Sequence, residues 1–219
     1  FAGFGAGIKA IFPGLGEARA IRLNHRLKTE PGAQAGIIDG NPCRADLDEA
    51  VAFVSTPMFL LDGACGPDGA VHAAVAGDVR RAWRVGADHI RPWFTVHAAR
   101  APVVIASDVP PVTSSLYQAA RIAAAAAPLV DDGGLLVLVA ECRGGIGPLD
   151  TVNEAIFRIG VLPRLPSNAR IALVSSLRPD DVARTRGAYA ASVKEAIAAS
   201  SGPVLAIPRA STLLCESSS

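Results

Sequence analysis

Short apolar runs alternate with helix-like stretches through the second half of the chain, and this alternation limits the folds that the chain can adopt. The apolar runs cover residues 102–107, 134–141, 170–175 and 203–208. Helices are expected at residues 114–130, 151–159, 179–186 and 192–199. Because strands that are apolar on both faces need helices on both sides, the pattern predicts an α/β fold with a parallel, Rossmann-like sheet covered by helices.

The first part of the chain follows a different pattern. Residues 1–16 are rich in glycine and read as a loop, residues 17–27 as a helix or a buried turn, and residues 30–41 as turns. Asp46 is expected to cap a helix that runs through Val54, since Asp is a favoured N-cap residue.

A hairpin and a second helix are expected next. Residues 58–61 and 71–75 predict two strands around a glycine-rich turn, and Asp78 predicts the cap of an amphipathic helix that Pro92 closes. The change of pattern places a domain boundary within residues 91–100, which gives one domain of residues 1–97 and another of residues 98–219.

Composition and charge argue against several classes of protein. Lys and Arg number 21 and Asp and Glu number 20, so no charge excess attracts nucleic acid. The apolar runs are shorter than the ~20 residues that span a bilayer, so no membrane partner is expected. The four cysteines form no CxxC pair, which favours a reducing, cytoplasmic location. The start at Phe1 in a glycine-rich motif is expected to lie within a longer polypeptide.

Three short motifs near the N-terminus could carry chemistry. The segment GFGAGIKAIFPG fits neither a Walker phosphate loop nor a dinucleotide fingerprint, but it places Lys9 in an apolar loop where partial desolvation would make its amine a usable nucleophile. The imidazole of His25, after Asn24, could be a nickel ligand or a base. GNP at residues 40–42 indicates only a bend, a lysine in a loop is usually just solvated, and a lone histidine is more often structural.

The order of the motifs carries more information than any of them alone. AGFGAGIKAIFPG is followed by NH at residues 24–25, GIIDGNP at 36–42, LYQAAR at 116–121 and GGLLVLVAECRGGIG at 133–147. This series resembles the nickel-pincer lactate racemase family of 2-hydroxyacid racemases and epimerases, over nearly the whole chain and as its C-terminal two-thirds. The corresponding family stretches look like AGFSGGxKxILPG, NH, EGNP and LYQxxK.

The resemblance implies roles for individual residues. Lys9 would be joined through a thioamide to a nickel-bearing pyridinium mononucleotide, with Gly5 and Gly7 in the cofactor loop and His25 as the protein ligand to nickel. Residues 1–97 would then be the C-terminal part of a cofactor-binding domain. In the C-terminal domain the substrate-positioning residues would be Tyr117, Gln118 and Arg121.

The resemblance also implies a reaction and its partners. Removal of hydride from a 2-hydroxyacid leaves a 2-keto acid that can take hydride back on either face, while two histidines act as general bases. In the family both histidines precede the glycine-rich loop, so this sequence contains neither and is expected to be inactive alone. Cofactor-synthesis proteins and a small 2-hydroxyacid would be its partners, and Arg121, where the family often has Lys, suggests a substrate other than lactate.

Two alternatives remain open at this point. The altered loop, with Ala6, and the missing histidines also fit a non-catalytic ligand-binding or regulatory relative on the same scaffold. The other alternative is an ordinary nucleotide-binding α/β enzyme that uses the loop of residues 141–147 at the end of a strand.

Overall fold

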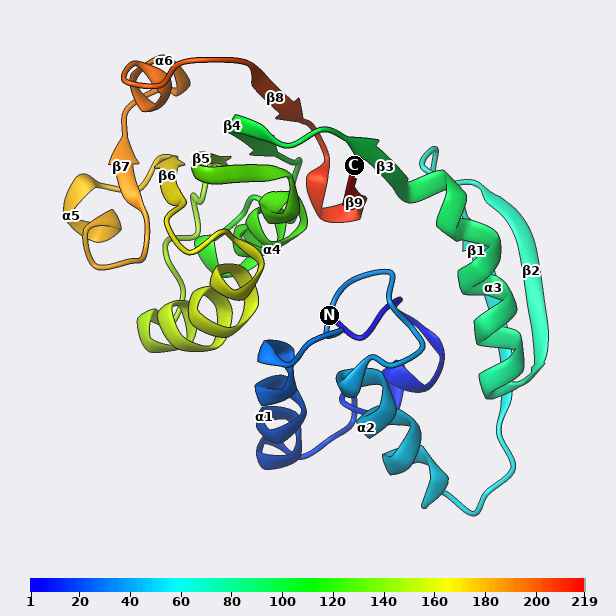
Figure 1. Cartoon of the computed structure of the whole chain (residues 1–219). Coiled ribbons are helices and arrows are strands. Elements are labelled where there is room, and N and C mark those ends of the chain that lie inside the picture. Colours follow the sequence, from blue (N-terminus) through cyan, green and yellow to red (C-terminus); the bar gives the residue numbers. More distant parts are fainter. Residues whose placement is uncertain (219) are drawn as a thin grey trace. The chain divides into compact units, whose positions relative to one another are not determined.

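The chain forms two compact units. The computed structural model describes residues 1–218, and its units are Phe1–Thr95 and Val96–Ser219 (Figure 1). Within residues 1–218, no helix has both the length and the hydropathy of a transmembrane span.

The second unit is built on a parallel sheet of five strands. The strand order is β7-β6-β5-β4-β8, and every neighbouring pair is parallel. The strands are β4 (Ala101–Ser107), β5 (Val130–Val139), β6 (Arg170–Val174), β7 (Ala188–Ala190) and β8 (Val204–Ile207). The predicted α/β class with a parallel sheet flanked by helices is therefore confirmed, with one further strand, β7, that is only three residues long.

Helices connect these strands. They are α4 (Leu116–Ala126), a π-helix (Thr151–Val161), α5 (Pro179–Val182) and α6 (Val193–Ile197), with short 3₁₀ segments at Ala127–Leu129, Leu162–Arg164 and Ala210–Thr212. The predicted helix of residues 114–130 is too long, because Val130 already belongs to β5. A separate two-stranded sheet joins β3 (Thr95–Ala98) to β9 (Leu214–Ser217), and neither strand was expected.

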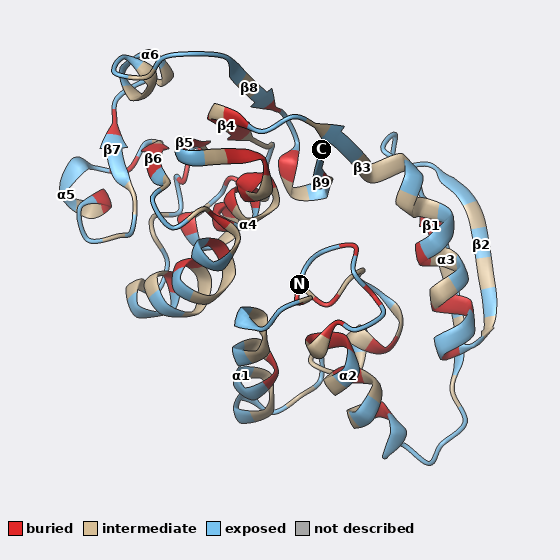
Figure 2. Cartoon of the chain, in the orientation of Figure 1, coloured by how far each residue is buried: buried red, intermediate tan, exposed pale blue. Residues whose placement is uncertain are grey.

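Alternating residues of the central strands enter two different cores. Val104, Leu136 and Leu138 pack in a large cluster with the alanine-rich face of α4. Val103, Leu135 and Val137 pack on the other side, against residues of α6. The buried residues on both faces explain why these strands read as continuous apolar runs (Figure 2).

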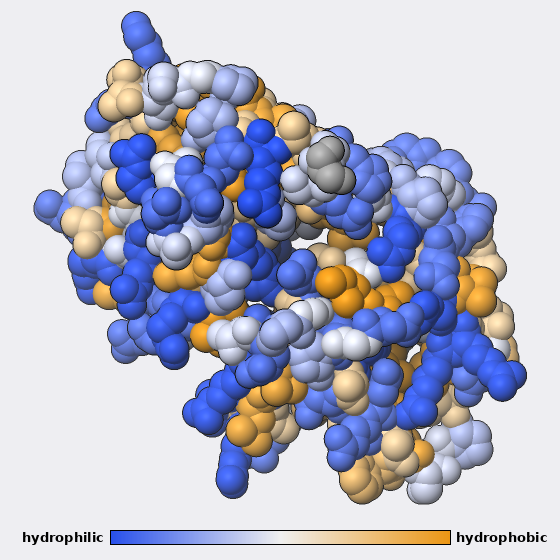
Figure 3. Space-filling model, in the orientation of Figure 1, coloured by the Kyte–Doolittle hydropathy of each residue, from blue (hydrophilic) through white to orange (hydrophobic). Residues whose placement is uncertain are grey.

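The first unit contains three helices and a hairpin. Its elements are a 3₁₀ turn (Gly7–Ala10), α1 (Ala18–Arg26), a 3₁₀ turn (Leu27–Thr29), α2 (Pro42–Ala52), β1 (Phe59–Cys65), β2 (Val71–Asp78) and α3 (Val79–Phe94). β1 and β2 are antiparallel, as expected. Polar side chains cover most of the surface seen in Figure 3, with apolar patches between them.

Two predicted helix boundaries in this unit are wrong, and one is confirmed. Asp46 lies inside α2, whose N-cap is Asn41 with Pro42 at the first helical position. Pro92 lies inside α3, because a proline in the last turn removes only one hydrogen bond and the helix continues to Phe94. The Asp78 carboxylate accepts hydrogen bonds from the main-chain N–H groups of Arg80 and Arg81, as an N-cap should.

Candidate functional site

Lys9 and His25 lie on different elements but contact the same aromatic ring. Lys9 belongs to the 3₁₀ turn of Gly7–Ala10 and His25 to the last turn of α1. The Nζ atom of Lys9 is 4.6 Å from the centroid of the Phe1 ring, and the His25 ring meets the same ring edge-on with centroids 5.1 Å apart. The Nζ atom of Lys28 lies 4.3 Å from that centroid. We call Phe1, Lys9, His25 and Lys28 the Phe1 cluster.

The electrostatics of the Phe1 cluster keep His25 uncharged. Burial, followed by the positive charges of Lys28 and Lys9, lowers the pKa of His25 to about 4. The imidazole is therefore neutral at neutral pH, with one ring nitrogen free of a proton. A neutral imidazole is the form that binds a metal ion.

Asn24 fixes the helix that presents His25. Its side chain is fully buried, and Nδ2 donates to the carbonyl oxygen of Cys43 at 3.1 Å and to the Asp46 carboxylate at 2.8 Å. Both acceptors are on α2, so these bonds hold α1 against α2. In the NH motif, the asparagine therefore anchors the helix that carries the histidine.

Asn41 performs the corresponding task for Phe1. Its Nδ2 donates to the carbonyl oxygens of Phe1 at 2.8 Å, Ile37 at 2.9 Å and Gln34 at 3.2 Å. Its Oδ1 accepts from the main-chain N–H of Arg44 at 3.2 Å and caps α2. One side chain thus ties the start of the chain, the turn region and α2 together.

The predicted cofactor-loop glycines have different surroundings. A Cβ atom at Gly7, where φ is +55°, would lie 2.6 Å from the Trp83 side chain, so the packing of Trp83 demands a glycine. Gly5 has open space around its Cα, and its carbonyl oxygen accepts a 2.6 Å hydrogen bond from Nε1 of Trp83. Trp83 of α3 therefore fixes the path of the loop, and no motif indicated this contact.

Tyr117, Gln118 and Arg121 lie on the first turns of α4, in the second unit. α4 follows β4, so its beginning lies at the carboxyl edge of the parallel sheet, where α/β folds commonly bind ligands. Tyr117 is partly exposed, and Arg121 donates to the Oε1 atom of Gln118.

The loop of residues 141–147 packs against this end of α4. The carbonyl oxygens of Gly145 and Ile146 accept hydrogen bonds from the main-chain N–H groups of Leu116 and Tyr117. The N–H groups of Gly144 and Gly145 donate to carbonyl oxygens of the protein itself. The loop is thus internally paired, which does not favour its use as a phosphate loop.

Sequence reasoning missed part of the site. Phe1 and Lys28 complete the Phe1 cluster, and no motif indicated either of them. Within residues 1–218, no group of three or more His, Cys, Asp or Glu side chains gathers as a metal site.

Comparisons with known proteins agree with one another. Residues 1–36 match the model of the lactate racemase N-terminal domain. A lactate racemase of Thermoanaerobacterium thermosaccharolyticum is 31% identical over 174 residues, which are 72% of this chain and 41% of the relative. One from Lactiplantibacillus plantarum is 29% identical over 150 residues, 67% of this chain and 35% of the relative. These aligned residues cover less than half the length of either relative.

Solved structures show the same fold. The apoprotein of the T. thermosaccharolyticum lactate racemase superposes with a TM-score of 0.85 at 22% identity, covering 99% of this chain and 60% of that one. A Thermotoga maritima protein superposes with a TM-score of 0.74 at 12% identity, covering 99% of this chain and 64% of that one.

Proposed function

Because the chain belongs to the lactate racemase family, we propose that it forms part of a nickel-dependent racemase or epimerase of a 2-hydroxyacid. The observation that carries the proposal is the Phe1 cluster, in which Lys9 and His25 meet around one ring. These are the residues that the resemblance implies for cofactor attachment and nickel binding. Lys9 and His25 are the only lysine and histidine of this chain to which the proposal assigns a role.

The donor set of the Phe1 cluster fits a nickel-pincer pyridinium nucleotide. His25 offers a neutral imidazole, which suits nickel, and Lys9 offers an amine beside it. The Phe1 ring face already attracts two ammonium groups, and a pyridinium cation would be attracted in the same way. When bound, this group would supply a carbon that accepts hydride from the substrate and returns it.

The other residues with a proposed role position the substrate. We assign to Tyr117, Gln118 and Arg121 the orientation of the substrate, with the planar guanidinium of Arg121 facing its carboxylate. Arg121 already donates to Gln118, so the two side chains are held together before a substrate binds. No residue of this chain is assigned as the general base for the substrate hydroxyl.

Peptide mass spectrometry tests the proposed attachment. The polypeptide is produced together with the cofactor-synthesis proteins, and the modified residue is mapped. The adduct is expected on Lys9 and should be lost in Lys9→Arg, whereas Lys28→Arg serves as a matched control that keeps it. An adduct on Lys28, or none on the mature protein, would refute the assignment.

Nickel content separates the role of His25 from that of Lys9. His25→Ala is expected to keep the adduct but to lose most of the bound nickel, measured by inductively coupled plasma mass spectrometry. Because this chain is expected to be inactive alone, racemisation of a panel of single-enantiomer 2-hydroxyacids is measured by chiral chromatography with a longer polypeptide that contains it. A longer polypeptide that carries the adduct but converts none of them would support the non-catalytic alternative.

A further inference from the structure

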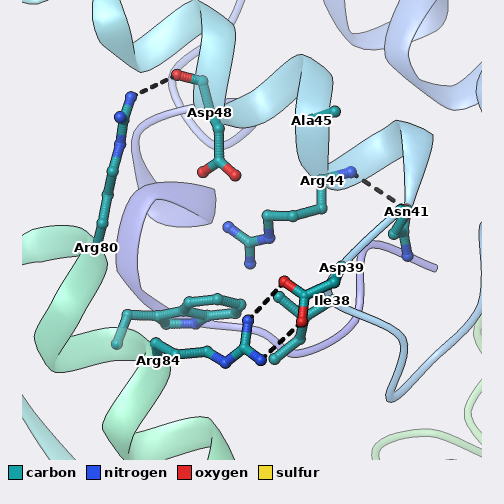
Figure 4. A pocket seen from close by; sticks show the side chains of 10 residues that line it. Ile38, Asp39, Asn41, Arg44, Ala45, Asp48, Arg80 and Arg84 are labelled. Atoms are coloured by element: carbon teal, nitrogen blue, oxygen red, sulfur yellow. Dashed lines mark hydrogen bonds and ion pairs between the residues drawn. The ribbon is translucent and has the colours of Figure 1, made fainter.

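A polar cavity lies in the first unit, and no residue of the Phe1 cluster lines it. Its volume is about 290 Å³, and its walls are α2, α3 and the turn before α2 (Figure 4). Neither Lys9 nor His25 lines it. The charged residues in its wall are Asp39, Arg44, Asp48, Arg80 and Arg84.

Arg44 is the unusual member of this set. It is only 2% exposed, its Cζ atom lies 3.7 Å from the centroid of the Trp83 ring, and its Nη2 donates to the carbonyl oxygen of Phe4 at 3.3 Å. Among residues 1–218, the buried Nε and Nη1 atoms find no hydrogen-bond partner. Because a buried guanidinium with unused donors is costly, the fold holds a cation here that still needs an acceptor.

The other charges of the cavity do not supply this acceptor. Both Asp39 oxygens accept from Arg84, at 2.8 Å each, and Arg84 also pairs with Asp88. Arg80 donates to the main-chain oxygen of Asp48. The Asp48 carboxylate faces the cavity in Figure 4 but accepts no hydrogen bond from Nε or Nη1 of Arg44.

We propose that this cavity binds a small oxyanion, a carboxylate or phosphate group, that accepts hydrogen bonds from Arg44. Three arginines and two aspartates line the wall, and Asp88, which does not line it, also pairs with Arg84, so the proposal rests on the unused donors of Arg44 and not on an excess of charge. The guanidinium is held over the Trp83 ring, so it loses little conformational freedom when an anion binds. The site is separate from the proposed cofactor site, and each can fail without the other.

Nuclear magnetic resonance of the tryptophan indoles tests the proposal. The Nε1–H of Trp83 lies in the ring under Arg44, whereas that of Trp93 serves as an internal reference. The whole chain, without any cofactor, is titrated with inorganic phosphate and separately with acetate at constant ionic strength. A saturable shift of the Trp83 signal is expected, and the tighter of the two probes identifies the preferred group.

Variants assign the binding to Arg44. Arg44→Gln should weaken binding about tenfold or more, because a charge-assisted donor is lost. Asp48→Asn should tighten it several-fold by removing a competing negative charge, and it tests the site even if Arg44→Gln does not fold. Arg81→Gln, an exposed change on the same helix as Trp83 and outside the cavity, should leave the affinity unchanged.

Three results would overturn the proposal. They are the absence of a saturable shift with either probe, unchanged binding in a folded Arg44→Gln protein, and weaker binding in Asp48→Asn. The last result would mean that the anion does not bind beside Asp48, where the loss of a negative charge must favour it.

Discussion

Replacing Asn41 with alanine should destabilise the first unit by about 2–4 kcal/mol. The change removes the N-cap of α2, which contributes about 1 kcal/mol. It also removes the side-chain amide group that donates to the carbonyl oxygens of Phe1, Gln34 and Ile37. Loss of each of its two N–H groups costs about 1 kcal/mol, and a carbonyl oxygen that stays buried without a partner adds to this cost. Asn41 is only 1% exposed, so water does not readily replace these bonds.

Tryptophan fluorescence measures this unit separately. Both tryptophans, Trp83 and Trp93, belong to the first unit, whereas both tyrosines, Tyr117 and Tyr189, belong to the second. Urea unfolding with excitation at about 295 nm therefore follows the first unit, and the midpoint of Asn41→Ala should fall by about 2 M. Far-ultraviolet circular dichroism reports both units together.

Asn41→Asp is the control that identifies the cause. Asp is as good an N-cap as Asn, so a cap-only role predicts nearly wild-type stability. The carboxylate would instead face three carbonyl oxygens without a proton to donate, and we expect a loss at least as large as in the alanine variant. A wild-type midpoint for Asn41→Asp would refute the role of the three carbonyl bonds.

The first unit and the cysteines give three more predictions. His25 should titrate in proton NMR with a pKa of about 4, below its unfolded value of about 6.5. The free energy of unfolding should therefore be highest above pH 6.5 and fall by about 1–3 kcal/mol as the pH drops towards 4, and His25→Gln should remove this pH dependence. Gly7→Ala should lower the melting temperature of the first unit because the new methyl group meets Trp83, whereas Gly5→Ala, with open space, should not; equal effects would contradict the packing role of Gly7. A thiol reagent at about pH 8 should label exposed Cys65 in the native protein and spare Cys142 and Cys215, in which burial raises the pKa of the thiol to about 11; fast labelling of either would contradict their burial.

The central sheet was predictable because its strands are buried on both faces. The continuous apolar run of residues 135–139 in β5 has the length of a strand and is typical of one that helices cover on both sides. β7 was not predicted because a strand of three residues is too short to show a periodic pattern. β3 and β9 were not predicted because they pair with each other from opposite ends of the second half of the chain. Local sequence cannot specify a pairing between segments so far apart.

The site was predictable only in part for a related reason. Asn41 and Asp46 are both good N-cap residues, and the choice between them depends on the three carbonyl oxygens that the fold brings to Asn41. Arg44 reads as a surface residue, because an arginine is rarely buried without a partner. The resemblance named Lys9 and His25, but their shared contact with Phe1 depends on the packing of α1 against α2.

Under the proposed role of α4 in substrate positioning, the substrate preference of the second unit can change without cost to the scaffold. The main-chain N–H groups of Leu116, Tyr117 and Gln118 are all paired within the protein, by the loop of residues 141–147 and by Ser115. A molecule that reaches this end of the helix must therefore be recognised by side chains and not by main-chain N–H groups. Exchanging those side chains would alter selectivity while every backbone bond that shapes the edge of the sheet stays in place.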